Sequence, residues 1–174
     1  ISSIDFKRII SRASNIVDKD AKEIEESIIE DKNTALFKTE AKFISERTLK
    51  VGKESIKGKK IIIAAGTRPS IPPIEGLKDV DFITSDEALR LKKQPKAMTI
   101  LGGGYIAAEL AHFYGALGTK INIIQRNRLL IPNEDEEIAS EFTRIFRKKY
   151  NVLTEFDAKS VIKKNGKFVV IAEG

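Results

Sequence analysis

Hydrophobic residues recur at spacings of three and four along the first part of the chain. The set comprises Phe6, Ile9, Ile10, Ala13, Ile16, Val17, Ala21, Ile24 and Ile28. Such spacing places side chains on one face of a helix. It predicts an amphipathic helix from about Asp5 to Glu30 whose apolar stripe packs on the rest of the protein, with a partner helix in a coiled coil as the alternative.

The pattern then changes to that of strands. Residues 34–39, 41–45 and 48–51 form three short runs separated by polar residues, and each run predicts a strand. The run 60–65 is almost continuously aliphatic, which is typical of a strand buried on both faces. Segment 66–76 is rich in proline and glycine, so it cannot form a helix and predicts an extended connector between two domains.

From residue 84 onward, helix and strand patterns alternate. The predicted elements are a short helix capped by Thr84 (84–93), a strand (97–101), a helix (104–117), a strand (120–125), a helix (135–150), a strand (152–156) and a hairpin (161–163 and 168–171). The Asn165-Gly166 pair between the last two strands is typical of a two-residue hairpin turn. Strand, helix and strand in succession form a βαβ unit, so the pattern indicates an α/β fold.

Composition limits the possible classes of protein. The 174 residues are 41% hydrophobic, which suffices for one domain or two small ones, and no apolar run approaches the roughly 20 residues of a membrane span. The chain begins Ile1-Ser2-Ser3, without an initiator methionine or a secretory signal, so we expect an internal piece of a longer protein. It has no cysteine, which excludes disulfides within this piece and agrees with a cytoplasmic setting.

The net charge of +6 does not by itself indicate a nucleic-acid-binding protein. The basic residues form short runs, such as 57–60 and 147–149, that are separated by acidic clusters and not interleaved with aromatic residues. Solvated faces explain this distribution better than a nucleic-acid interface does. The positive excess still favours anionic small molecules, including phosphate-bearing cofactors.

The segment 102–107, GGGYIA, fits the G-x-G-x-x-G/A pattern of a dinucleotide-binding turn. In that pattern Gly102 permits the tight turn out of the strand, Gly104 lets the backbone approach a pyrophosphate, and Ala107 keeps the helix close to the sheet. The helix N-terminus then offers N–H donors and partial positive charge to the phosphates. A strand before the turn and a second strand ending about 20 residues later complete the fingerprint, which makes it far more specific than the hexapeptide alone.

The residues after the second strand bear on which cofactor binds. NAD-binding proteins usually place an acidic residue there to bond the ribose hydroxyls, but this chain has Gln125. Gln125 can bond a hydroxyl without repelling a 2′-phosphate, and Arg126 and Arg128 can pair with that phosphate. The sequence therefore favours NADPH over NADH slightly, with relaxed preference or solvent-exposed arginines as the alternatives.

No catalytic centre can be assembled from the residues of this chain. His112 is the only histidine and there is no cysteine, and the residues around His112 do not have the spacing that would indicate a Ser-His-Asp triad or a metal-ligand cluster. The paired acids at 86–87 and 134–136 stand at predicted helix starts, where capping explains them. We therefore predict no catalytic residue and no metal site in this piece.

Two longer segments resemble a known family. IIIAAGTRPSIPPIEG (61–76) and TSDEALRLKKQPKAMTILGGGYIAAELAHFYGALG (84–118) are similar to the flavin-dependent pyridine nucleotide-disulfide oxidoreductases of class I, in the family's order and at its spacing. Dihydrolipoamide dehydrogenase, glutathione reductase, mercuric reductase and mycothione reductase are members. The resemblance implies a Rossmann-like FAD/NAD(P)-binding three-layer fold with two partial dinucleotide-binding domains: residues 1–82 for FAD, with the connector, and residues 83–174 for NAD(P)H.

The resemblance also implies roles for individual residues. FAD would contact Glu40 and Ala41 in TEAKF, and Ala65 and Gly66 where the family has Ala-Thr-Gly. NAD(P)H would be held by Gly102, Gly103, Gly104, Tyr105, Ile106, Ala107 and Glu109, with Gln125, Arg126 and Arg128 at the ribose. Tyr105 matches the aromatic residue that covers the flavin in the glutathione reductase branch, and Glu109 matches the acid near the nicotinamide.

The implied reaction passes hydride between NAD(P)H and FAD and on to a disulfide or dithiol, in a dihydrolipoamide dehydrogenase-like protein in the broad sense. The alternatives are an NADPH-dependent reductase of the mycothione or glutathione type, a flavin NAD(P)H oxidoreductase that does not act on disulfides, and a nucleotide-binding interaction module without enzymatic activity. The family's first glycine loop, its C-x4-C pair and its C-terminal H-x4-E pair do not occur in this chain. We therefore expect the piece alone to be inactive and the parent protein to be a homodimer acting on a small-molecule or protein-bound disulfide.

Overall fold

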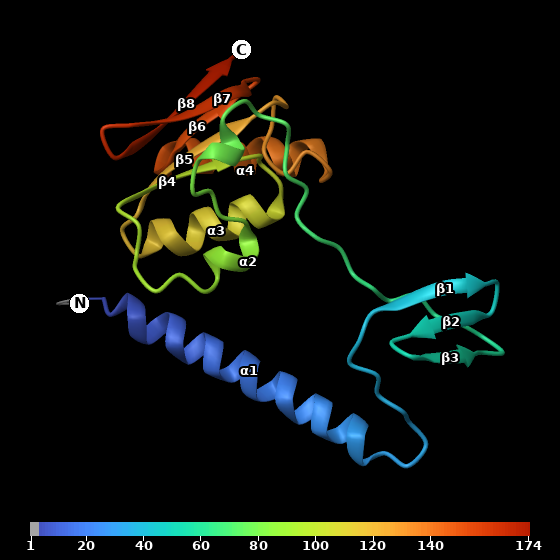
Figure 1. The fold of residues 1–174 in the computed structure, drawn as a ribbon. Coiled ribbons are helices and arrows are strands. Elements are labelled where there is room, and N and C mark those ends of the chain that lie inside the picture. Colours follow the sequence, from blue (N-terminus) through green and yellow to red (C-terminus); the bar gives the residue numbers. More distant parts are fainter. Residues whose placement is uncertain (1–3) are drawn as a thin grey trace. The chain divides into compact units, whose positions relative to one another are not determined.

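The structure is a computed structural model that describes residues 4–174. The chain divides into two compact units (Figure 1). The larger unit comprises the N-terminal residues through Arg12 together with Pro69–Gly174, and the smaller unit comprises Ala13–Arg68. In the part of the chain that the structure describes, no helix has both the length and the apolar character that a membrane span requires.

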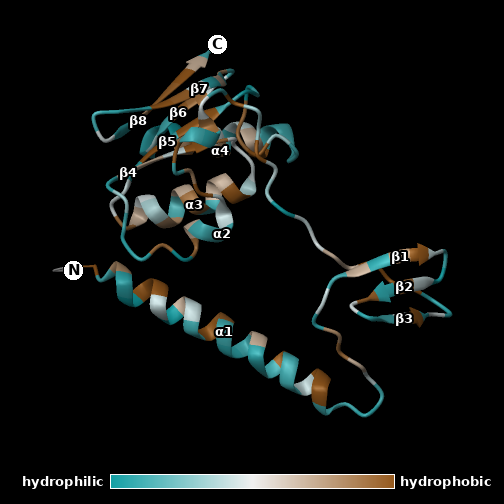
Figure 2. Cartoon of the chain, in the orientation of Figure 1, coloured by the Kyte–Doolittle hydropathy of each residue, from teal (hydrophilic) through white to brown (hydrophobic). Residues whose placement is uncertain are grey.

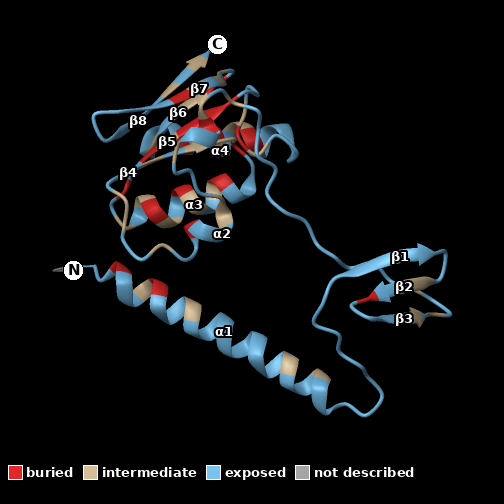
Figure 3. Ribbon diagram, viewed as in Figure 1, coloured by how far each residue is buried: buried red, intermediate tan, exposed pale blue. Residues whose placement is uncertain are grey.

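The predicted N-terminal helix is confirmed as α1 (Phe6–Glu30). Hydrophobic residues recur along its whole length, as Figure 2 shows, but only its first turns are buried (Figure 3). Phe6 and Ile10 are buried in the core of the larger unit, whereas Ile16 and Ile24 are 55% and 62% exposed. The expectation that the apolar stripe packs on the protein therefore holds for the first part of the helix only.

The smaller unit contains a three-stranded antiparallel sheet of β1 (Ala41–Ser45), β2 (Thr48–Val51) and β3 (Glu54–Lys57), in that order. The first two strands match the predicted ranges. The third strand was not predicted, because Glu54–Lys57 is polar at three of its four positions. Gly52, with a φ of 57°, makes the turn that brings β3 alongside β2, from Val51 opposite Glu54 to Thr48 opposite Lys57.

Two predicted strands are wrong. Residues 34–39 and 60–65 are irregular, and Ile62 and Ile63 are 90% and 73% exposed. An aliphatic strand of this kind is stable when neighbouring strands satisfy its backbone and side chains cover its faces. Among the described residues, none pairs with either segment as a strand. Residues 60–65 therefore have the composition of a buried strand, but no neighbouring strand in the described part of the chain pairs with them.

The larger unit is built on a parallel sheet in which β5 (Lys120–Gln125) lies between β4 (Ala97–Leu101) and β6 (Asn151–Thr154). The crossovers are α3 (Tyr105–Ala116) and α4 (Glu136–Lys149). Side chains of α3, β5 and α4 form one apolar cluster, so both helices cover the same face of the sheet. The antiparallel pair β7 (Asp157–Lys164) and β8 (Lys167–Glu173) forms a further layer on the opposite face (Figure 1). This three-layer arrangement confirms the predicted α/β, Rossmann-like fold.

The turn signals of this unit are also confirmed. Asn165 and Gly166 have φ values of 51° and 71°, as a type I′ hairpin turn requires. The helix predicted from Thr84 is shorter than expected, since α2 covers only Ser85–Ala88. Its capping box is complete: the Thr84 side chain accepts from the first turn, and the Thr84 N–H donates to Glu87 at 2.7 Å. The Thr84 hydroxyl also donates to Glu87 Oε2 at 2.6 Å, and this bond, followed by the bond from the Thr84 N–H, holds the pKa of the Glu87 carboxyl below its ordinary value.

The core of the larger unit is centred on Tyr114, whose side chain is fully buried. The buried cluster comprises Phe6, Ile10, Ala88, Ala111, Tyr114, Ile121, Ile123, Leu130 and Phe146. The Tyr114 hydroxyl donates to the carbonyl oxygen of Ala88, and burial raises the pKa of the phenol. Phe6 and Phe113 pack against its ring with centroids 5.9 Å and 5.1 Å away. This cluster packs the first turns of α1, together with α2 and α3, against the sheet.

The connector meets β7 at Glu75. The Glu75 N–H donates to Lys159 O at 3.2 Å, and the Val161 N–H donates to Glu75 O at 2.8 Å. At the next residue, Gly76, φ is 70°, and the short helix η1 (Leu77–Asp79) begins directly after it. A Cβ at Gly76 would lie 2.3 Å from the carbonyl oxygen of Val161, so only glycine fits between the connector and β7.

We expect Gly76→Ala to lower the free energy of unfolding by about 2 kcal/mol, because the new methyl group meets backbone and the positive φ is strained. Gly166→Ala is the matched control: Gly166 also has a positive φ, but a Cβ there has no neighbour within 4 Å. It should cost about 1 kcal/mol through φ alone. Urea unfolding of both variants measures the difference, and equal losses would contradict the close approach at Gly76.

Candidate dinucleotide site

The glycine turn joins β4 to α3. Gly102 has a φ of 110°, which favours glycine, and its N–H donates to Ile124 O at 2.8 Å, so the turn stays paired with β5. Gly104 is the N-cap of α3 and, like any glycine, supplies no side-chain acceptor. The N–H groups at the start of α3 therefore lack the side-chain partner that usually satisfies them, and the helix dipole adds partial positive charge. This is the arrangement that binds phosphate at helix N-termini.

The middle glycine of the turn has a packing role that the sequence motif does not indicate. A Cβ at Gly103 would lie 2.6 Å from Leu130 Cδ2 and 3.0 Å from Gln125 Cγ. The Gly103 carbonyl oxygen also accepts a hydrogen bond from the N–H of Ile131 at 2.6 Å. Gly103 therefore fastens the turn to the loop that follows β5, a contact between segments almost 30 residues apart in the sequence.

The two other glycines of the turn face open space, and both line a cavity of about 660 Å³ in the larger unit. Tyr105, Ile106 and Ala107 line the same cavity, and Tyr105 is 70% exposed. The cavity wall is mainly apolar, with Met98, Ile100 and Leu101 of β4 among its members. A concave apolar site beside convergent backbone donors is the usual form of a cofactor pocket. The turn thus fits a dinucleotide: it has free donors, and no side chain fills the space at Gly104.

Gln125, the last residue of β5, is only 6% exposed. Its side chain lies under Gly103, and its amide nitrogen donates to the carbonyl oxygen of Leu129 at 3.4 Å. The structure thus gives Gln125 a partner in the protein itself and places it directly beside the glycine turn. The ribose contact expected of this residue stays a prediction.

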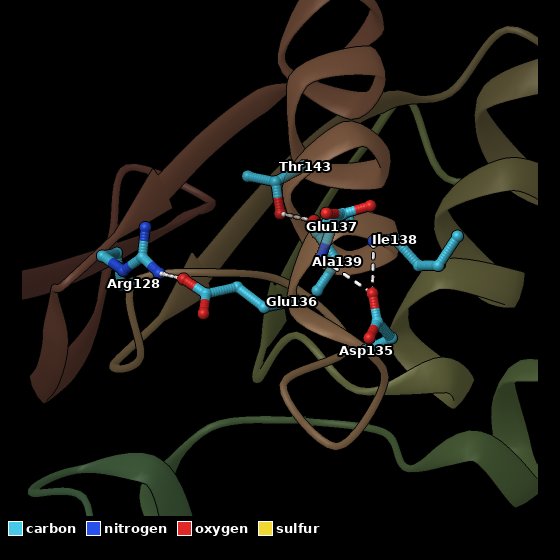
Figure 4. A network of polar contacts seen from close by, with 7 residues as sticks. All are labelled: Arg128, Asp135, Glu136, Glu137, Ile138, Ala139 and Thr143. Atoms are coloured by element: carbon cyan, nitrogen blue, oxygen red, sulfur yellow. Dashed lines mark hydrogen bonds and ion pairs between the residues drawn. The ribbon is translucent and has the colours of Figure 1, made fainter.

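The two arginines after β5 are exposed, and a carboxylate lies near each of them. Arg128 Nη2 lies 2.5 Å from Glu136 Oε1, the first residue of α4 (Figure 4). Arg126 contributes to the lowered pKa of Asp157, after the larger effect of the hydrogen bond and charge of Lys159. The arginines thus lie beyond the carboxyl end of β5, where a ribose ligand is expected, but neither stands alone.

The loop that carries Arg128 is anchored to α4. The Leu130 N–H donates to Thr143 Oγ1 at 2.9 Å, and that hydroxyl donates to Ala139 O at 2.7 Å. Asp135 caps α4 by accepting from the N–H groups of Glu137 and Ile138 at 3.0 Å and 3.4 Å (Figure 4). The backbone of this loop is therefore hydrogen-bonded to α4, the helix that begins with Glu136.

The remaining predicted positions lie elsewhere. Glu109 is exposed on α3 and does not line this cavity, and the same holds for His112, which was not predicted as a site residue. Glu40 and Ala41, at the start of β1, and Ala65 and Gly66, in the irregular segment after β3, belong to the smaller unit and are exposed. The structure therefore brings together the glycine turn, Gln125 and the following loop, and the FAD contacts stay predictions.

Comparison with known proteins assigns the chain to a family. Residues 2–174 match the pyridine nucleotide-disulphide oxidoreductase family, and the chain belongs to it. Over 143 residues, 82% of the chain and 23% of the relative, it is 34% identical to a mercuric reductase of Bacillus cereus. Over 101 residues, 58% of the chain and 22% of the relative, it is 39% identical to mycothione reductase of Mycobacterium tuberculosis.

A solved structure shows the same fold. The HOCl-induced flavoprotein disulfide reductase RclA from Escherichia coli superposes with a TM-score of 0.88 at 28% identity, covering 98% of this chain and 40% of that one. The chain spans only about a quarter of the length of the mercuric and mycothione reductases. The family predicted from the sequence is confirmed, as is its cofactor class of FAD with NAD(P)H at the level of the family.

Proposed function

We propose that this chain supplies the nicotinamide-dinucleotide site, and part of the FAD site, of a flavoprotein NAD(P)H:disulfide oxidoreductase, dihydrolipoamide dehydrogenase-like in the broad sense. The overall reaction would consume NAD(P)H, a proton and one disulfide, and yield NAD(P)⁺ and two thiols, or run in reverse from a dithiol. The observation that carries the proposal is the glycine turn at the N-terminus of α3, open at Gly104 and beside an apolar cavity, in a chain of this family. When bound, FAD supplies a two-electron carrier between nicotinamide and disulfide.

Different residues of the larger unit would bind different parts of NAD(P)H. The backbone of the 102–104 turn and the first turn of α3 would hold the pyrophosphate, with Ile106 and Ala107 against the cavity. Arg126 and Arg128 would meet a phosphate on the 2′-hydroxyl of the ribose. Tyr105 and Glu109 would lie toward the nicotinamide and flavin, and Gly103 would keep the turn in place.

A specific observation favours an NADPH-dependent reductase of the mycothione or glutathione type as the second candidate. Gln125 brings no negative charge to the ribose site, and two exposed arginines follow it. Either candidate implies a small-molecule or protein-bound disulfide as substrate and, in the parent protein, a homodimer. A cytoplasmic location belongs to the same proposal.

The test is a fluorescence titration of the chain with NADPH and with NADH. We expect NADPH to bind more tightly, and Arg126→Ala to weaken NADPH binding about tenfold while changing NADH binding less than twofold, because one charge-assisted bond is lost. Arg144→Ala is the control, since Arg144 is an exposed arginine of α4 that pairs with Glu141 away from the turn. Equal or tighter binding of NADH by the unaltered chain would remove the phosphate-pairing role of the arginines.

A further inference from the structure

Arg128 and Glu136 form an ion pair between the loop that follows β5 and the first residue of α4. The guanidinium and carboxylate are 2.5 Å apart, and their side chains are 61% and 76% exposed. Glu136 begins α4, whose N-terminus Asp135 caps, and the Arg128 loop is bonded to α4 through Leu130 and Thr143. Glu136 thus faces Arg128 from a helix to which the arginine's loop is hydrogen-bonded (Figure 4).

The two arginines of this loop are therefore not equivalent toward an anion. Arg128 already has a carboxylate on its guanidinium. The acid near Arg126 is Asp157, whose carboxylate bonds Lys159 at 2.8 Å, so part of its charge is neutralised by that lysine. A phosphate could therefore bind the Arg126 guanidinium with less competition from a carboxylate than it would meet at Arg128. At Arg128 it would have to displace Glu136 or share the guanidinium with it.

We infer that Glu136 is a specificity-determining residue that competes with the cofactor's 2′-phosphate for Arg128. The inference rests on the proposed function. A carboxylate and a phosphate both bind a guanidinium through the same N–H groups, and a second negative charge at that distance repels the phosphate. Glu136 therefore lowers the affinity for NADPH and leaves that for NADH, which has no 2′-phosphate, almost unchanged.

Glu136 could have the opposite effect on NADPH affinity, and the same titration distinguishes the two effects. If Glu136 instead orients Arg128 for the phosphate, its removal weakens NADPH binding. If it competes, its removal tightens NADPH binding by the strength of an exposed ion pair, about two- to fivefold. The sign of the change in NADPH affinity thus separates competition from orientation.

The experiment compares Glu136→Gln with Glu134→Gln in the full chain, titrated with NADPH, NADH, 2′-AMP and 5′-AMP. Glu134 is an exposed acid of the same loop, so its variant removes the same charge from a neighbouring position. We expect Glu136→Gln to tighten NADPH and 2′-AMP binding about two- to fivefold, with NADH and 5′-AMP changed less than 1.5-fold. Glu134→Gln should change all four less than 1.5-fold by general charge alone. Thermal unfolding checks that each variant is folded.

A double-mutant cycle with Arg128→Ala completes the test. On the Arg128→Ala background the effect of Glu136→Gln should disappear, because the shared guanidinium is gone. An equal gain with and without Arg128, an equal gain in Glu134→Gln, or a loss of NADPH affinity in Glu136→Gln overturns the inference and leaves the nucleotide site standing. Absence of binding by either dinucleotide in every variant overturns the proposed function, and the inference with it.

Discussion

Replacing Tyr114 by alanine is expected to lower the free energy of unfolding by about 3–5 kcal/mol. The ring is fully buried at the centre of the cluster that joins α1, α2 and α3 to β5, so its removal leaves a cavity that the surrounding residues cannot fill. Its hydroxyl is also the partner of the Ala88 carbonyl oxygen, which ties α2 to α3. Chemical unfolding of the variant measures the loss directly.

Two further variants separate the causes. Tyr105→Ala removes the same side chain from the same helix at a position 70% exposed, so its stability should change by about 0.5 kcal/mol or less. Tyr114→Phe keeps the ring and removes only the hydroxyl, which should cost about 1–2 kcal/mol for a buried carbonyl left without its donor. Similar losses at Tyr105 and Tyr114 would show that the core is not where the structure places it.

The parts of the fold predicted from sequence are those that local patterns determine. The bounds of β4 and β5 agree with the predicted 97–101 and 120–125. Asp135 and Thr84 occupy cap positions because their side chains accept from the following turn, which depends on residues two or three positions away. The acidic residues at the start of α4 and the basic residues at its end likewise interact with the dipole of that same helix, which is a local effect.

The wrong strand predictions concern segments whose structure depends on pairing with a distant part of the chain. The composition of residues 60–65 favours a strand, but a strand exists only when another backbone accepts its hydrogen bonds, and composition does not reveal the partner. Strand β3 is the converse case: Ser55 and Lys57 would not predict a strand, but the turn at Gly52 places the segment beside β2. Tertiary context decided both outcomes.

At the candidate site, too, the local features were predicted and the contacts between distant segments were not. The spacing of Gly102, Gly104 and Ala107 indicates a dinucleotide turn, because each role depends on a neighbour in the motif. The contact of Gly103 with Leu130 and the ion pair of Arg128 with Glu136 join separate elements, so no local signal predicts them. The role of the arginines therefore cannot be judged from their positions in the sequence alone.

Replacing Gly104 by valine is expected to weaken NADPH binding by roughly a hundredfold or more, while changing the free energy of unfolding by about 1 kcal/mol or less. Gly104 has an ordinary φ of −77°, and a Cβ there has no neighbour within 4 Å, so neither the backbone nor the Cβ opposes a larger residue at this position. The branched side chain would occupy the space through which a pyrophosphate reaches the N–H groups of α3, and two bonds to charged oxygens would be lost. Fluorescence titration and thermal unfolding of one sample measure both quantities.

Gly103→Ala should show a different balance, and the comparison identifies what each glycine does. Its Cβ would meet Leu130, which is 1% exposed and cannot move aside, so we expect a stability loss of about 1–3 kcal/mol. NADPH binding should weaken less than in the Gly104 variant, because the N–H groups of α3 stay accessible. Undiminished NADPH binding by a folded Gly104→Val variant would mean that the dinucleotide does not approach the N-terminus of α3. In that case the cavity beside the turn, and not the turn itself, would have to account for any binding.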